Sequence, residues 1–152
     1  MKNKISILIS ILLLAAGCST YSENDLKLFD EKIQSFIAAN DLEYSKSESG
    51  LYFKIIQEGE GDNYIKYNDQ VTFCYRGRFL DGNVFQEINE NNPITFKLRE
   101  LIIGWQESIS LLKTKGQINV IIPPQLGYGN KQTELIPPNT ILVYEIKILE
   151  VI

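Results

Sequence analysis

The side chains in this chain that could carry out chemistry are mostly aromatic, and histidine is absent. The only tryptophan, Trp105, lies where an apolar run ends and apolar residues begin to recur at helical spacing. A large ring at the start of a short helix can form the floor of a cavity, although a single ring of this kind is more often part of a hydrophobic core. A reaction here would depend on an apolar, aromatic-walled site with little acid–base character. The candidate rings are Tyr75, Phe85, Trp105, Tyr128 and Tyr144.

The elements that must position these rings are mainly strands separated by tight turns. Alternating apolar residues predict strands at 51–57, 70–79, 94–98, 117–122 and 141–151. In the second of these, Val71, Phe73 and Tyr75 share one face. With a short central helix that opens at Trp105, the strands predict an α+β fold. In this fold a curved antiparallel β-sheet is wrapped around the short central helix.

An additional N-terminal helix is predicted over residues 24–39, ahead of the strands. Ser22-Glu23-Asn24-Asp25 forms a capping pattern, and Asn40-Asp41 ends the helix. Its apolar residues fall on one face: Leu26, Phe29, Ile33, Phe36 and Ile37. That face either covers the chain's own globular domain or contacts a partner. A dimer through helix 24–39 is one form of the second alternative.

The first residues predict export followed by lipid anchoring. Residues 1–17 contain Lys2 and Lys4, then an apolar run, then small residues, as secretory signal peptides do. The ending Leu14-Ala15-Ala16-Gly17-Cys18 resembles a bacterial lipobox, so we expect Cys18 to be lipidated and to hold the protein at a membrane. The alternative is an ordinary signal peptide with a fortuitous cysteine. Ser19 resembles the sorting pattern of the outer membrane, facing the periplasm, more than inner-membrane retention.

Composition excludes several classes of function. Removing residues 1–17 changes the net charge from −4 to −6, and an acidic chain argues against nucleic acid as a partner, because phosphate binding needs a basic face. With Cys18 acylated, Cys74 has no disulfide partner and is interpreted as a small apolar strand residue. No Cys/His cluster has the spacing of metal ligands, so neither a metal nor a cofactor is expected. The predicted organisation is a signal peptide at 1–17, a tether and helix at 18–49, and one compact domain at 50–152.

Five motifs in the compact domain resemble the FKBP family of peptidyl-prolyl cis-trans isomerases, over about residues 50–152. The first three are Val71-x-Phe73-x-Tyr75-x-Gly77, Leu80-Asp81-Gly82-x-x-Phe85 and Ile102-x-Gly104-Trp105. The other two are Pro123-x-x-Leu126-Gly127-Tyr128-Gly129 and Ile136-Pro137-Pro138-x-Thr140-Ile141-Leu142-Val143-Tyr144. The lipobox and the stretch 25–50 also resemble cell-envelope lipoprotein members of this family.

The resemblance implies a pocket that binds the proline of a polypeptide client, without a cofactor. By position, the catalytic residues would be Tyr75, Phe85, Gln86, Trp105, Tyr128 and Tyr144, and the substrate-binding residues Ile94, Leu101, Ile102 and Ile136. Trp105 would be the floor under the pyrrolidine ring. The backbone N–H of Ile102 and the hydroxyl of Tyr128 would donate hydrogen bonds to the bound chain.

The sequence departs from the family at two of these positions and at one position nearby. Gln86 stands where many active members have aspartate, and Glu90 where the arginine that pairs with it is common. Ile94 replaces an aromatic residue. Three hypotheses follow. The first is a lipid-anchored isomerase that assists the folding of exported cell-envelope proteins. The second is a catalytically weak binding module of the same fold that scaffolds an envelope complex, and the third is a lipoprotein of purely structural role.

Overall fold

The computed structural model describes residues 21–152, so the predicted signal peptide and Cys18 lie outside the described residues. The described part contains two α-helices, α1 (Glu23–Ala39) and α2 (Ile103–Ile109). It also contains two short 3-10 helices, η1 (Leu98–Glu100) and η2 (Pro124–Leu126). The strands are β1 (Ser45–Lys46), β2 (Tyr52–Gln57), β3 (Gln70–Phe79), β4 (Val84–Ile88), β5 (Ile94–Lys97), β6 (Gln117–Ile122) and β7 (Leu142–Val151).

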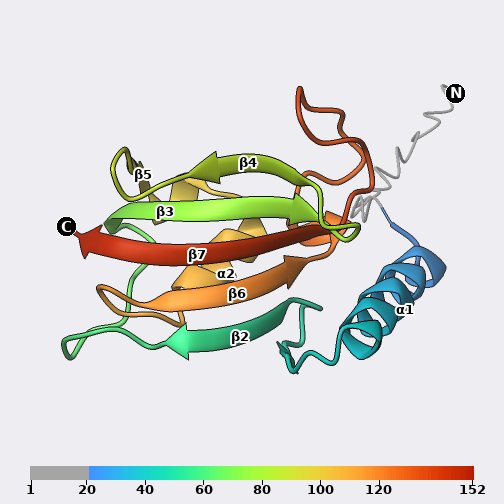
Figure 1. The fold of residues 1–152 in the computed structure, drawn as a ribbon, viewed down its shortest axis with the longest axis horizontal. Helices are drawn as coiled ribbons and strands as arrows, with labels where there is room; N and C mark the ends of the chain where they lie inside the picture. The colour runs from blue at the N-terminus through green and yellow to red at the C-terminus, as the bar shows by residue number, and fades with distance from the viewer. Residues whose placement is uncertain (1–20) are drawn as a thin grey trace, which may run out of the picture.

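The strands of the described part form one seven-stranded antiparallel sheet in the order β1-β2-β6-β7-β3-β4, and β5 pairs with the first half of β3. Helix α2 lies behind the sheet in Figure 1, and α1 lies at one end of it. This arrangement confirms the predicted α+β fold, with an antiparallel sheet around a short central helix and an additional N-terminal helix.

The predicted strands and helices are present, and their ends differ from the predictions by at most two residues. Strands β1 and β4 were not predicted from the sequence, because most of their residues are exposed at the edges of the sheet and show no apolar alternation. The turn at residues 80–83 separates β3 from β4. Cys74 lies in β3 and is buried, as expected of a small apolar strand residue.

One face of the sheet and helix α2 enclose the main hydrophobic core. Alternate residues of the central strands point into it, as the period of a strand requires. From β6 and β7 these residues are Ile118, Val120, Ile122, Leu142, Tyr144, Ile146 and Ile148. Trp105 and Ile109 of α2 close the core from the other side.

Helix α1 covers the opposite face of the sheet at one end. Phe29 and Ile33 are buried against Tyr52, Ile121 and Val143, which lie at the start of β2, near the end of β6 and near the start of β7. The predicted capping box is present, since Ser22 Oγ accepts from the Asp25 N–H and the Asp25 carboxylate accepts from the Ser22 N–H. The helix therefore packs on its own domain. A dimer through helix 24–39 stays a prediction, and would have to use other residues of the helix.

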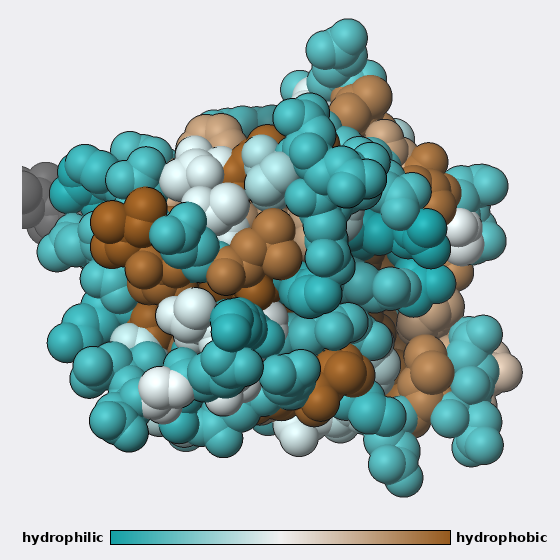
Figure 2. Space-filling view, turned by 60° about the vertical axis from the view of Figure 1, so that its left-hand side comes forward, coloured by the Kyte–Doolittle hydropathy of each residue, from teal (hydrophilic) through white to brown (hydrophobic). Residues whose placement is uncertain are grey.

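The surface outside this contact carries scattered apolar side chains. Figure 2 shows the left-hand side of Figure 1, where apolar residues lie in several separate areas with hydrophilic residues between them. Scattered exposed apolar residues are normal on globular proteins and do not by themselves mark an interaction site. Among residues 21–152, no helix combines the length and the hydropathy that crossing a bilayer requires.

The packing of α1 predicts the effect of truncating its buried side chain. Ile33→Ala should lower the free energy of unfolding by about 2–5 kcal/mol, because Ile33 is 0% exposed between α1 and the sheet. The matched variant Leu28→Ala lies on the same helix at 48% exposure and should cost less than about 1 kcal/mol. Urea unfolding of the full chain measures both values. Equal losses for the two variants would contradict the docking of α1 on the sheet.

Candidate active site

Trp105 enters the core from the first turn of α2. Ile102 caps this helix, and its carbonyl oxygen accepts hydrogen bonds from the N–H groups of Trp105 at 2.9 Å and Gln106 at 3.0 Å. Gly104 lies so close to β6 that a Cβ would come within 2.7 Å of the Ile122 side chain. Only glycine allows this approach, which leaves the Trp105 ring 5% exposed against the inner face of the sheet.

Further aromatic side chains gather around the Trp105 ring, and the ring centroid of Phe73 lies 5.2 Å from that of Trp105. The ring centroids of Tyr75 and Tyr144 lie 4.8 and 4.9 Å from that of Trp105, at interplanar angles of 79° and 88°. Tyr144 also lies 5.7 Å from Phe85, again edge to face. These are the arrangements that aromatic rings prefer, since the positive edge of one ring faces the negative face of the next. Strand β3 thus contributes two rings, Phe73 and Tyr75, and β4, β7 and α2 contribute one ring each to a single cluster.

A β-bulge and a glycine bring Phe85 into this cluster. In the β3–β4 ladder Gly77 pairs with Gln86 and Arg78 pairs with Val84, so Phe85 is the extra residue of the bulge. A Cβ on Gly77 would lie 2.6 Å from the Phe85 ring and 2.7 Å from the Tyr144 ring. Glycine at this position therefore leaves room for both rings to lie across β3.

The polar groups of the cluster are held in their neutral form. Burial raises the pKa of Tyr75 to about 12, and the phenol of Tyr128 adds to this shift. Burial also raises the pKa of Tyr144 far above its ordinary value, with contributions from Tyr128 and Tyr75. The hydroxyl of Tyr75 donates a hydrogen bond of 2.7 Å to Gln86 Oε1. The site therefore carries hydroxyl donors but no phenolate at neutral pH.

The remaining predicted pocket residues lie beside the same core. Ile136 is buried in it, while Ile94, Leu101 and Ile102 are half-buried and pack against it. Tyr128 follows η2 and is 37% exposed, near enough to Tyr75 and Tyr144 to affect their pKa values. The structure thus brings together the residues that the motifs single out. Their catalytic and binding roles stay predictions.

Gln106 contributes to this site and was not predicted from the sequence. Its Nε2 donates to the carbonyl oxygen of Leu101 at 2.6 Å and to that of Arg99 at 3.3 Å. These bonds tie the segment before α2 to the helix itself, and so help to place Leu101 and Ile102. A glutamine in a helix has no spacing or composition signal, so only the hydrogen bonds seen in the structure identify it.

The positions that depart from the family have separate partners in this structure. Gln86 accepts from Tyr75, whereas Glu90 forms an ion pair with Lys147 at 2.6 Å. Both Gln86 and Glu90 are exposed, so replacing a charged pair at these positions leaves no unpaired charge in the core.

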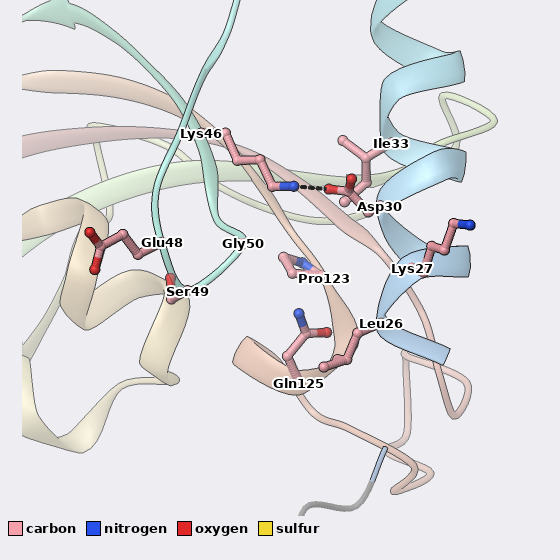
Figure 3. A pocket seen from close by; sticks show the side chains of 10 residues that line it. All are labelled: Leu26, Lys27, Asp30, Ile33, Lys46, Glu48, Ser49, Gly50, Pro123 and Gln125. Carbon is pink, nitrogen blue, oxygen red and sulfur yellow. Dashed lines mark ion pairs between the residues drawn. The ribbon is translucent and has the colours of Figure 1, made fainter. Parts of the chain in front are cut away.

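A pocket of about 370 Å³ lies away from the aromatic cluster, between α1, the segment before β2 and the start of η2 (Figure 3). None of the predicted pocket residues lines it. Asp30 of α1 accepts there from Lys46, from the Tyr52 hydroxyl and from Gln34. Partial burial acts to raise the pKa of Asp30, but these hydrogen bonds outweigh it and lower the pKa. The charged wall of this pocket thus serves to hold α1 on β1 and β2.

This chain is similar in sequence to several known proteins. The chain is 34% identical over 142 residues to a probable FKBP-type peptidyl-prolyl cis-trans isomerase of Haemophilus influenzae, which covers 91% of this chain and 58% of the relative. It is 39% identical over 108 residues to the FKBP-type isomerase FkpA of Buchnera aphidicola, covering 70% of this chain and 43% of the relative. The chain spans about half the length of the curated relatives it matches.

A solved structure and a family model agree with these relatives. The crystal structure of FkpA from Escherichia coli matches with a TM-score of 0.72 and 31% identity, over 85% of this chain and 62% of that one. The family model described as FKBP-type peptidyl-prolyl cis-trans isomerase matches residues 61–149, more than half of the chain. That match includes β3 to β6, α2 and nearly all of β7, which carry the aromatic cluster. The chain therefore belongs to the FKBP-type peptidyl-prolyl cis-trans isomerase family.

Proposed function

We propose that this chain catalyses the cis–trans isomerisation of X–Pro bonds in polypeptides. The observation that carries the proposal is the convergence of Tyr75, Trp105 and Tyr144 from three elements around one apolar site. This cluster lies within the region that matches the family. Trp105 is the floor on which the pyrrolidine ring of the client rests.

An apolar site suits this reaction because of what changes during rotation. Amide resonance opposes rotation of a peptide bond by ~18–20 kcal/mol. At the twisted transition state this resonance is lost, so the nitrogen and the carbonyl are less charge-separated than in the planar ground state. A site that excludes water removes stabilisation from the planar dipole, and so favours the twisted form relatively. No general base or nucleophile is required, which agrees with the neutral phenols of the cluster.

Two donors position the client chain over Trp105. Ile102 caps α2 through its carbonyl oxygen, and the N–H of a capping residue is not part of the helix's own hydrogen bonds. Tyr128 is exposed enough for its hydroxyl to meet a bound peptide. Both donors hold the client so that rotation occurs within the apolar site, and only binding that is stronger at the transition state accelerates it.

The proposal extends to the place where the protein acts. Lipidation of Cys18 anchors it to a membrane, with the outer membrane facing the periplasm favoured by Ser19. Its clients are then exported cell-envelope proteins whose X–Pro bonds limit folding, since the uncatalysed step takes tens to hundreds of seconds. The lipobox pattern of the sequence supports the anchor, and relatives named as FkpA support the isomerase activity.

A second candidate function is a binding module with weak catalysis, which would use the same pocket and helix 24–39 to scaffold an envelope complex. Two observations favour it. The neutral Gln86, rather than a carboxylate, accepts from Tyr75, and Ile94 makes one wall smaller than an aromatic residue would.

The isomerase activity is tested with the full chain in mild detergent, using exchange NMR of a proline tetrapeptide. We expect the chain to accelerate exchange over the spontaneous rate. Tyr128→Phe should still bind the peptide but lower kcat about three- to tenfold, because one hydrogen bond to the client is lost. Tyr67→Phe, which removes a hydroxyl at a 59% exposed position, is the matched control. A folded parent chain without acceleration would refute the proposed activity, and a Tyr128→Phe variant as fast as the parent would refute the role of its hydroxyl.

The neutral site predicts a flat pH profile. Because burial favours the uncharged phenol, Tyr75 ionises only near its raised pKa of about 12, and Tyr144 is raised as well. The chain has no histidine that would titrate near neutrality. We expect kcat/KM for the tetrapeptide to stay constant within about twofold between about pH 6 and pH 9. A bell-shaped profile in this range would instead indicate general acid–base catalysis.

Gln86→Asp separates the two candidate functions. If the neutral amide limits catalysis, a carboxylate acceptor at this exposed position should raise kcat/KM about threefold or more with an unchanged Tm, because the hydrogen bond from Tyr75 becomes charge-assisted. The control is Glu87→Gln, which changes charge at the next residue of β4, where the side chain pairs with Arg76. An unchanged or lower kcat/KM in Gln86→Asp would show that the amide is not what limits the rate.

A further inference from the structure

Tyr21, which lies just before α1, contacts the two segments that carry part of the predicted pocket. Its hydroxyl donates a hydrogen bond of 2.7 Å to Asn139 Oδ1, across 118 positions of the sequence. The same hydroxyl lies next to Gly129, where a Cβ would be 3.9 Å away. Its ring meets Phe29 of α1 edge to face at 5.2 Å. Tyr21 therefore joins the start of α1 to the two loops that contain Gly129 and Asn139.

Asn139 in turn joins the two loops to each other. It has a φ of +58°, a left-handed conformation that asparagine tolerates better than most residues. Its N–H donates to the Gly129 carbonyl at 2.8 Å. Tyr128 directly precedes Gly129, and Ile136 lies three residues before Asn139, in the segment 136–140. The Tyr21–Asn139 bond thus acts on the backbone that places Tyr128 and Ile136.

We propose that Tyr21 is a positioning residue for the pocket wall formed by segments 127–129 and 136–140, acting through Asn139; this inference rests on the proposed isomerase function. Tyr21 is fixed by its contact with Phe29, and Phe29 is buried against the sheet. The docking of α1 is therefore coupled to the placement of Tyr128 and Ile136. The region ahead of the compact domain takes part in forming the client site, in addition to connecting it to the predicted anchor.

The test compares Tyr21→Phe with the parent chain, since this variant keeps the ring on Phe29 and removes only the hydroxyl. We expect KM for the proline tetrapeptide to rise about three- to tenfold, with kcat changed by less than about twofold, because the wall becomes less ordered before the client binds. The amide of residue 139 should exchange with solvent about fivefold faster or more. The Tm should change little, because one exposed hydrogen bond contributes little to global stability.

Two further variants make the test specific. Tyr64→Phe is the matched control, because its hydroxyl donates to Glu58 in another part of the fold, and it should change neither KM nor the exchange at residue 139. Asn139→Gly tolerates the positive φ but lacks the acceptor, and should reproduce the rise in KM. Combining it with Tyr21→Phe should add nothing further, because both remove the same bond.

The outcomes distinguish this inference from the function on which it rests. Parental KM and parental exchange in Tyr21→Phe would overturn the positioning role while leaving the isomerase activity standing. An inactive parent chain would overturn the proposed function. Amide exchange at residue 139 would then be the measurement that tests whether Tyr21 positions the wall. Faster exchange at residue 139 in Tyr21→Phe supports the positioning of the wall, and unchanged exchange refutes it.

Discussion

Gly104 lets helix α2 approach β6 until Ile122 fills the space that a Cβ would need, and this close approach places the Trp105 ring against the inner face of the sheet. The other rings of the cluster are arranged around it. Tyr75 and Tyr144 present their edges or faces to Trp105 from neighbouring strands, and Phe85 reaches Tyr144 across Gly77. A larger residue at either glycine would separate the layers. The packing of one ring thus determines the geometry of the whole candidate site.

One end of the sheet is buried on both faces, so the sheet supports two hydrophobic cores. Residues of β6 and β7 alternate between the core under α2 and the smaller core under α1, so that Ile121 and Val143 face Ile33 while their neighbours face Trp105. Asp30 strengthens this contact through hydrogen bonds to β1 and β2. Because Tyr21 links the start of α1 to Asn139, the helix and the pocket loops belong to one connected structure.

The electrostatic character of the site follows from this packing. Burial raises the pKa of both Tyr75 and Tyr144, so the groups nearest to Trp105 are neutral donors and apolar ring surface. This environment is suited to rotation about an amide bond, whose transition state is less polar than its ground state. The hydroxyl of Tyr75 donates to the neutral amide oxygen of Gln86, so this hydrogen bond places no charge beside the cluster.

Much of this structure was predictable from the sequence by itself. The alternation of apolar residues determined which faces of β3, β6 and β7 are buried, because a strand's side-chain period is two. The sequence also predicted the capping residues and the apolar face of α1, because these depend on residues close together in the chain. The motifs around Trp105, Tyr128 and Tyr144 are likewise short stretches of sequence. The tertiary structure alone decided that α1 packs on its own domain and that Tyr21 reaches Asn139. Those contacts join residues that lie far apart in the sequence, through hydrogen bonds and close packing. They form only when the folded sheet brings separate elements together, so the spacing of residues along the chain does not predict them.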